Sequence, residues 1–257
     1  MAPNRTPGYA DQIRAPVDIK DGTTCCAAMP VSRPTGGLSA VWMLAQLAVG
    51  AVPDAGLSGA PAKASGGGVE MYKPGESPTF DKLSQDVADL GIRYVKGNLP
   101  KALAAEYIAE DNILAISHDE YLGYLRAAAG KREELRRSIT HELAHARQYK
   151  DLLKGVSDSK ARLRLLAEQA LKMSEDDFVA FAWNNELDAE RTAWIVDVES
   201  IDFFGRNRGD KPYPPGFLKQ IVDQRVNEFA DQAQSFYENR KRALYRALKQ
   251  ESKPSNP

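Results

Sequence analysis

This chain of 257 residues contains few cysteines and few histidines, and its positive and negative charges nearly balance. Its two cysteines, Cys25 and Cys26, are neighbours, so the sequence offers neither a disulfide framework nor a thiolate metal site. The formal net charge is -1, which excludes the large basic field that attracts nucleic acid or anionic lipid. We therefore expect no nucleic-acid partner, and any metal must be held by nitrogen and oxygen ligands.

The chain also lacks a long uninterrupted hydrophobic run. The apolar segment 38–52 contains Gln46 and Gly50 and is shorter than the about 20 residues that a membrane-spanning helix needs. Arg33 precedes the segment and the small residues 60–62 follow it, an arrangement typical of a secretory signal peptide. We expect a secreted or periplasmic protein without a membrane span after cleavage; the alternatives are a cytoplasmic protein and an anchor formed by uncleaved 38–52.

The expected domain organisation follows from these composition shifts. Residues 1–62 are expected to be a disordered leader with the signal peptide, because 1–37 are rich in Pro, Gly, Thr and Ser without apolar periodicity. A Gly/Ser linker at 63–70, a single folded domain at 71–250 and a tail at 251–257 follow. A start of translation at Met29 is a further hypothesis, which the N-terminal sequence of the native product would test.

Within 71–250 the patterns predict a helix, then three short strands, then mostly helices. Apolar residues from Phe80 to Leu90 recur at helical spacing after Ser77 and end at Gly91. Strands are expected at 92–96, 104–108 and 113–117, with a tight turn at 109–112. Helices are expected at 132–150, at 161–173, at 174–204 and around 222–248. The helix 174–204 has a capping box at its start and a stop signal at Gly205. The fold class is therefore α+β: a small, mostly antiparallel sheet followed by a predominantly helical domain.

One predicted helix carries the sequence His141-Glu142-Leu143-Ala144-His145. Residues i and i+4 share one face of a helix, so His141 and His145 can both bind one zinc ion. Glu142 stands at the adjacent edge of that face, where its carboxylate can take a proton from a zinc-bound water. Two of the three histidines in the chain fall at this spacing. The pattern favours a zinc site, with Glu142 as general base, over a chance arrangement on a solvated helix.

Catalytic zinc takes three protein ligands and leaves a fourth position open, so one more ligand is expected. Glu186, in the middle of the predicted helix 174–204, is the leading candidate. Glu190 lies one turn further on the same face and can accept a hydrogen bond from a ligating histidine, or be a ligand itself. Asp188 and His118 are the remaining alternatives.

This set of residues resembles the zincin metallopeptidases, and in particular the gluzincins, in which H-E-x-x-H is followed by a glutamate ligand on a later helix. Several gluzincin families continue the second motif as E-x-x-A followed by Asp or Asn; here Glu190 stands in that place. The resemblance implies a small mixed sheet before the active-site helix and a peptide or protein substrate. It also implies that an edge strand, assigned here to 113–117, binds the substrate backbone.

The sequence therefore predicts a hydrolase with one zinc ion per chain, of the peptidase type, in which a zinc-bound water attacks the substrate. The alternative is a non-catalytic binding or regulatory protein stabilised by zinc, which would have a fourth protein ligand. Candidate donors to the reaction's oxyanion are His118, Tyr121, Tyr149 and Arg191.

Two further expectations concern packing around the predicted site. The arginines of helix 132–150, including Arg136 and Arg137, are expected to be solvated or paired with Glu133 and Glu134. The aromatic residues of helix 174–204 are expected to lie in the core: Phe178, Phe181, Trp194, Phe203 and Phe204.

Overall fold

The computed structural model describes residues 71–97, 99, 103–126 and 130–252. The expected leader, its apolar segment 38–52, the linker 63–70 and most of the tail lie outside the described residues. All described residues belong to one compact unit of the chain. In this part of the chain, no helix has both the length and the apolar character that crossing a membrane requires.

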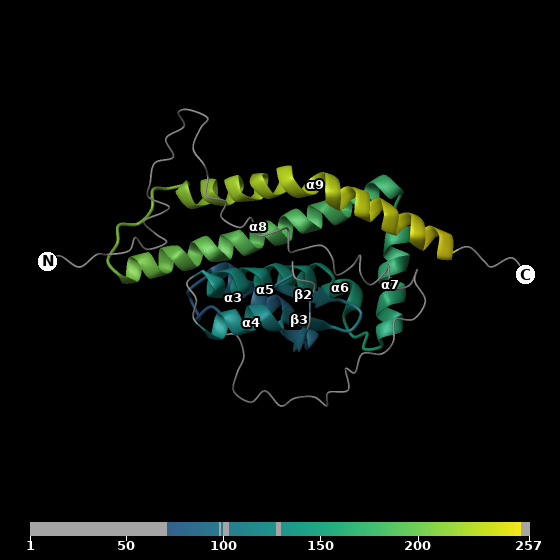
Figure 1. Ribbon diagram of the computed structural model, residues 1–257, viewed down its shortest axis with the longest axis horizontal. Helices are drawn as coiled ribbons and strands as arrows, with labels where there is room; N and C mark the ends of the chain where they lie inside the picture. Colours follow the sequence, from purple (N-terminus) through teal and green to yellow (C-terminus); the bar gives the residue numbers. More distant parts are fainter. Residues whose placement is uncertain (1–70, 98, 100–102, 127–129, 253–257) are drawn as a thin grey trace, which may run out of the picture. The chain divides into compact units, whose positions relative to one another are not determined.

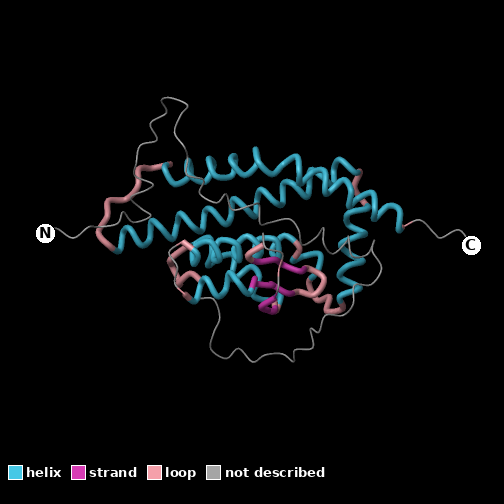
Figure 2. The backbone as a smooth tube through the Cα atoms, in the orientation of Figure 1, coloured by secondary structure: helices cyan, strands magenta, loops and turns pink. Residues whose placement is uncertain are grey.

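Three strands form one small sheet (Figure 2). They are β1 (Arg93–Gly97), β2 (Ala105–Ile108) and β3 (Ile113–Ser117), in the order β1-β3-β2. The turn between β2 and β3 makes that pair antiparallel, with Tyr107 opposite Leu114, whereas β1 runs parallel to β3. The α+β class with a small sheet and a mainly helical domain is confirmed. Spacing along the chain predicted the β2–β3 hairpin, but it could not predict that β1 pairs on the far side of β3.

The strand order corrects one expectation from the resemblance. Strand 113–117 is the central strand, with its backbone paired to β1 on one side and to β2 on the other. It cannot accept a further strand, because a central strand has no unpaired edge. Among the described strands, the edges of the sheet are β1 and β2.

The helix before the sheet has the expected boundaries. Helix α3 (Pro78–Val87) begins where the Ser77 hydroxyl accepts a hydrogen bond from the backbone N–H of Phe80 at 3.0 Å. A short 3-10 turn, η1 (Ala88–Leu90), follows and ends at Gly91, whose φ of 62° glycine adopts without steric cost. This Ser-to-Gly pattern is why the helix could be located from the sequence.

The remaining helices are α4 (His118–Leu125), α5 (Lys131–Gln148), α6 (Lys150–Leu153), α7 (Ser159–Leu171), α8 (Glu175–Asn207) and α9 (Phe217–Glu251). Helix α8 begins as expected, with the Ser174 hydroxyl accepting from the N–H of Asp177 at 3.2 Å. It passes through Gly205 instead of ending there. The chain turns away at Gly209, which has a φ of 83°.

Helix α8 contacts α5 on one side and α9 on another, and α5 in turn contacts β2 and β3 (Figure 1). The main core lies where α3, α5 and the sheet meet, and it includes the fully buried Leu83, Leu114 and Leu135. Helix α8 therefore presents different faces to α5 and to α9. Its remaining face stays open to solvent, so the expectation of core positions is wrong for Phe181 and Phe204, each 40% exposed.

The arginines of α5 pair with acidic residues distant in sequence. Arg136 donates to Glu76, which also accepts from the Ser200 hydroxyl, and Arg137 lies 3.6 Å from Asp197. For these two arginines, the expectation that they are solvated or paired with Glu133 and Glu134 is wrong. Buried carboxylates need a charged or hydrogen-bonding partner, and the arginines of α5 provide it where α3 and α8 meet this helix.

A buried arginine ties α7 to the β2–β3 turn. Arg162 is 4% exposed and donates to the backbone carbonyls of Ala109 (2.6 Å) and Val156 (2.9 Å). We expect Arg162→Met to lower the free energy of unfolding by about 3 kcal/mol, because these buried carbonyls would lose a charged donor. The melting temperature should fall by about 6–12 °C. Arg164→Met, at an exposed position of the same helix, is the control and should change stability by less than about 0.5 kcal/mol.

Candidate metal centre

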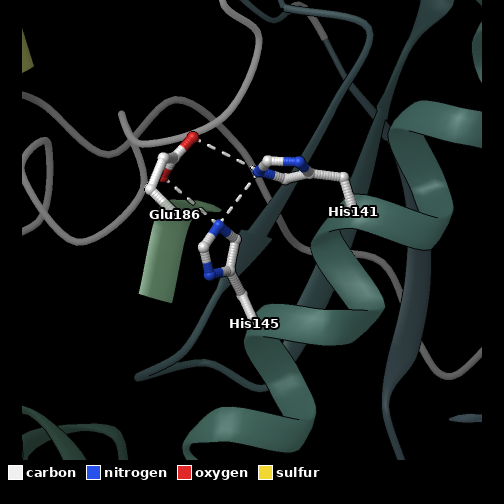
Figure 3. A group of neighbouring side chains, drawn as sticks. All are labelled: His141, His145 and Glu186. Atoms are coloured by element: carbon white, nitrogen blue, oxygen red, sulfur yellow. Dashed lines mark hydrogen bonds and ion pairs between the residues drawn. The ribbon is translucent and has the colours of Figure 1, made fainter. Parts of the chain in front are cut away.

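Three side chains from two helices converge at one point (Figure 3). His141 and His145 project from successive turns of α5, and Glu186 projects from α8. One potential ligand atom from each side chain lies within 4.8 Å of the others. His141 Nε2 is 3.4 Å from Glu186 Oε1, and His145 Nε2 is 3.5 Å from Glu186 Oε2. The carboxylate is fully buried and both imidazoles are nearly so.

The far nitrogen of each imidazole faces an acceptor. His141 Nδ1 lies 3.2 Å from Glu190 Oε2, and His145 Nδ1 lies 2.8 Å from Gln148 Oε1. The amide group of Gln148 is oriented by donating to the carbonyl of Asn185 at 2.8 Å. These acceptors favour the tautomers with the proton on Nδ1, so both Nε2 atoms keep a lone pair for a metal.

The converging atoms are therefore all electron donors. The two Nε2 atoms are 3.1 Å apart, and both oxygens of Glu186 are buried without a hydrogen-bond partner. Buried acceptors at such distances repel each other unless a cation lies between them. Two imidazole nitrogens and a carboxylate oxygen are ligands that suit a first-row transition metal or zinc. The residues of this centre could hold a metal ion.

The electrostatics of the centre also favour a positive charge. Burial lowers the pKa of His141, but the nearby carboxylates of Glu186 and Glu190 outweigh burial and raise this pKa well above its usual value. Burial raises the pKa of Glu186, yet the two histidines outweigh it and hold this pKa below its usual value. A proton on one histidine interacts with only some of these donor atoms. A metal ion can contact all three ligands at once.

Glu142 lies beside this group without belonging to it. It is 3% exposed, and its Oε2 accepts a hydrogen bond from the backbone N–H of Tyr107 in β2 at 2.8 Å. Burial raises the pKa of Glu142, opposed by the nearby histidines and by this N–H. Its Oε1 makes no hydrogen bond with a described residue, so the carboxylate is held at one oxygen and free at the other.

Of the other ligand candidates, Asp188 and His118 lie away from the group, and Glu190 contacts one of its histidines. Asp188 is largely exposed and binds Arg147 at 3.0 Å, and His118 is exposed at the start of α4. Glu190 contacts His141 through Oε2 and accepts from the indole N–H of Trp194 through Oε1, at 2.8 Å. The structure thus gives Glu190 the contacts of a residue that orients a histidine.

Of the expected oxyanion donors, only Tyr149 lies near the centre. It is half-buried one turn after His145, and burial together with the charge of Glu186 raises its pKa to about 12. Tyr121 packs beneath the ammonium of Lys96, and Arg191 pairs with Asp223. His118 is exposed on α4.

Two residues of α9 near the centre were missed by the sequence analysis. Tyr237 donates its hydroxyl to the carbonyl of Ala182 at 3.1 Å, and its pKa is raised by burial and by the charge of Glu186. Lys241 is buried one turn further along α9. Both occupy positions of the buried helical stripe, where the sequence pattern indicates only packing, so no local signal distinguished them.

Comparisons of the chain with protein-family models, with curated proteins and with solved structures found no match. Conclusions about function therefore rest on the residues and on the geometry of the centre. The residues that carry this geometry are His141, Glu142, His145 and Glu186.

Proposed function

We propose that this protein is a zinc-dependent hydrolase that cleaves peptide bonds. The observation that carries the proposal is the convergence of His141, His145 and Glu186, with the carboxylate of Glu142 held beside them. Among the described residues the metal-binding group has three members, the number of protein ligands found in catalytic zinc sites. Two imidazoles with one carboxylate is a donor set that such zinc sites use.

Zinc in this position would lower the pKa of a water molecule and polarise the carbonyl of the substrate. Glu142 then acts through its free Oε1, which takes a proton from the attacking water while the N–H of Tyr107 holds Oε2. The same carboxyl group delivers that proton to the leaving amine, which completes hydrolysis. Burial of Glu142 supports this role, because a raised pKa brings a carboxyl closer to neutral pH, where proton transfer in both directions is efficient.

The position of β2 supports a peptide as substrate. This strand lies at an edge of the sheet, and its Tyr107 N–H reaches the carboxylate of Glu142. Extended peptides bind sheet edges through backbone groups that the fold leaves unpaired; the Tyr107 N–H is already taken by Glu142, so a peptide would pair beside it. We therefore assign substrate binding to β2 in place of 113–117, since a peptide paired there would pass beside Glu142.

Metal content and peptide cleavage test the proposal together. The purified protein should contain about one zinc ion per chain, measured by elemental mass spectrometry, because the described residues form one three-ligand group. It should cleave members of a peptide library, read by mass spectrometry, and a chelator should abolish cleavage until zinc is restored. Bound zinc without cleavage of any peptide would refute the peptidase and favour a zinc-stabilised binding protein.

Glu190→Ala should weaken zinc binding by about 10–100-fold, because His141 would lose the acceptor that fixes its tautomer and orientation. Trp194→Phe should act in the same direction but less strongly, since it removes only the indole N–H that holds Glu190. Zinc affinity is measured by competition with a chromogenic chelator. Asp176→Ala removes an exposed carboxylate from the start of the same helix and should leave affinity unchanged. An unchanged affinity in Glu190→Ala would show that Glu190 does not support His141.

A further inference from the structure

The inner face of α9 carries a buried cation without a counter-ion. Lys241 is 3% exposed, and it makes no hydrogen bond or ion pair with any described residue. Its Nζ lies 4.7 Å from the centroid of the Tyr237 ring, a cation–π contact that offsets only part of the lost hydration. An ammonium that is largely removed from water and lacks a carboxylate partner is unfavourable, and an anionic ligand would stabilise it.

Lys241 belongs to the surroundings of the metal centre. It follows Tyr237 by one helical turn on the same face of α9, and Tyr237 donates to Ala182, one turn before Glu186 on α8. Burial lowers the pKa of Lys241 to about 8, and the charge of Glu186 opposes this shift. The lysine thus stays largely protonated at neutral pH, in the electrostatic field of a metal ligand.

Metal binding would leave the positive charge of Lys241 with less compensating negative charge nearby. Glu186 would then direct its charge to the metal ion, and the ion itself would repel the ammonium. The described residues provide no carboxylate paired with Lys241, so a negatively charged ligand would stabilise the ammonium. A peptide substrate offers carboxylates at its C-terminus and on its Asp and Glu side chains.

We propose that Lys241 binds a carboxylate of the peptide substrate next to the metal centre. The proposal rests on the proposed peptidase function and gives that function a substrate class, peptides with a negative charge near the cleaved bond. Tyr237 positions the lysine through the face of its ring, and its own hydroxyl is held by Ala182.

Binding to a hydrolytically inactive background tests this without relying on turnover. Zinc-loaded Glu142→Gln protein is titrated calorimetrically with matched peptides: free acid against C-terminal amide, and internal Glu against Gln. Adding Lys241→Met should weaken binding of the carboxylate-bearing peptide at least about tenfold and leave its neutral partner unchanged. The pair that responds identifies the carboxylate as terminal or as a side chain. Lys249→Met, at an exposed position of α9, is the matched control.

Thermal stability separates this role from a structural one. Lys241→Met replaces an unpaired buried charge by an apolar chain of similar length, so the melting temperature without peptide should rise by about 2–4 °C. The proposal is wrong if both peptides of every pair weaken equally, if neither weakens, or if Lys241→Met and Lys241→Gln both fail to fold. If the wild type cleaves no peptide while Lys241 still selects carboxylates, the peptidase function fails and the binding role stands. If cleavage is normal and Lys241→Met changes the binding of neither peptide of a pair, the binding role fails and the peptidase function stands.

Discussion

Glu142→Gln is expected to lower kcat/KM for peptide cleavage by about 10²–10⁴-fold and to leave zinc content at the wild-type value. The glutamine oxygen can still accept from the N–H of Tyr107, as Oε2 of Glu142 does at 2.8 Å, so the side chain keeps its position. Its amide nitrogen then occupies the place of Oε1 and cannot accept a proton. Glu142 is outside the metal-binding group, which is why the metal should remain.

Steady-state kinetics and elemental analysis of the same preparation check this prediction. Glu133→Gln, at an exposed position near the start of α5, is the matched control and should retain full activity. If Glu142→Gln is as active as the wild type, Glu142 is not the general base. If the variant loses its zinc, the carboxylate contributes to the metal site itself.

Glu186→Ala is expected to abolish zinc binding. This carboxylate is fully buried, its two oxygens lie 3.4 and 3.5 Å from the histidine Nε2 atoms, and they have no other partner. Without Glu186 only the two neutral imidazoles of α5 remain, and the charge that offsets a dication is lost. Zinc content should fall below about 0.1 per chain, since metal affinity depends steeply on the number and charge of the ligands.

A thermal shift assay reports the same loss independently of activity. Zinc at about 100 times its dissociation constant should stabilise the wild type by about 2.7 kcal/mol and raise its melting temperature by about 5–10 °C. Glu186→Ala should show no such shift. Asp176→Ala removes an exposed carboxylate at the start of α8 that pairs with Arg242, and it should shift as the wild type does. A wild-type response in Glu186→Ala would remove Glu186 from the ligand set.

Local signals in the sequence were sufficient for much of the fold. The Ser174 cap, the Ser77 cap and Gly91 mark helix ends through contacts within a few residues, and the structure shows these contacts. Gly205 was misleading because a glycine inside a helix costs only about 1 kcal/mol, and the positive φ that turns the chain is at Gly209. The exposure of Phe181 and Phe204 shows the same limit, since hydrophobicity alone does not say which face of α8 its neighbours cover.

The sequence by itself determined that His141 and His145 share a face with Glu142 beside them, because helical periodicity places residues i and i+4 together whatever surrounds the helix. It also placed Glu186 and Glu190 one turn apart on a second, capped helix. Only the tertiary structure decided that these helices meet, that β2 is the strand that holds Glu142, and that Tyr237 and Lys241 of α9 lie near Glu186. Those contacts join residues far apart in the chain, and they are set by which apolar faces bury one another, a property of the whole fold that spacing along the sequence does not contain.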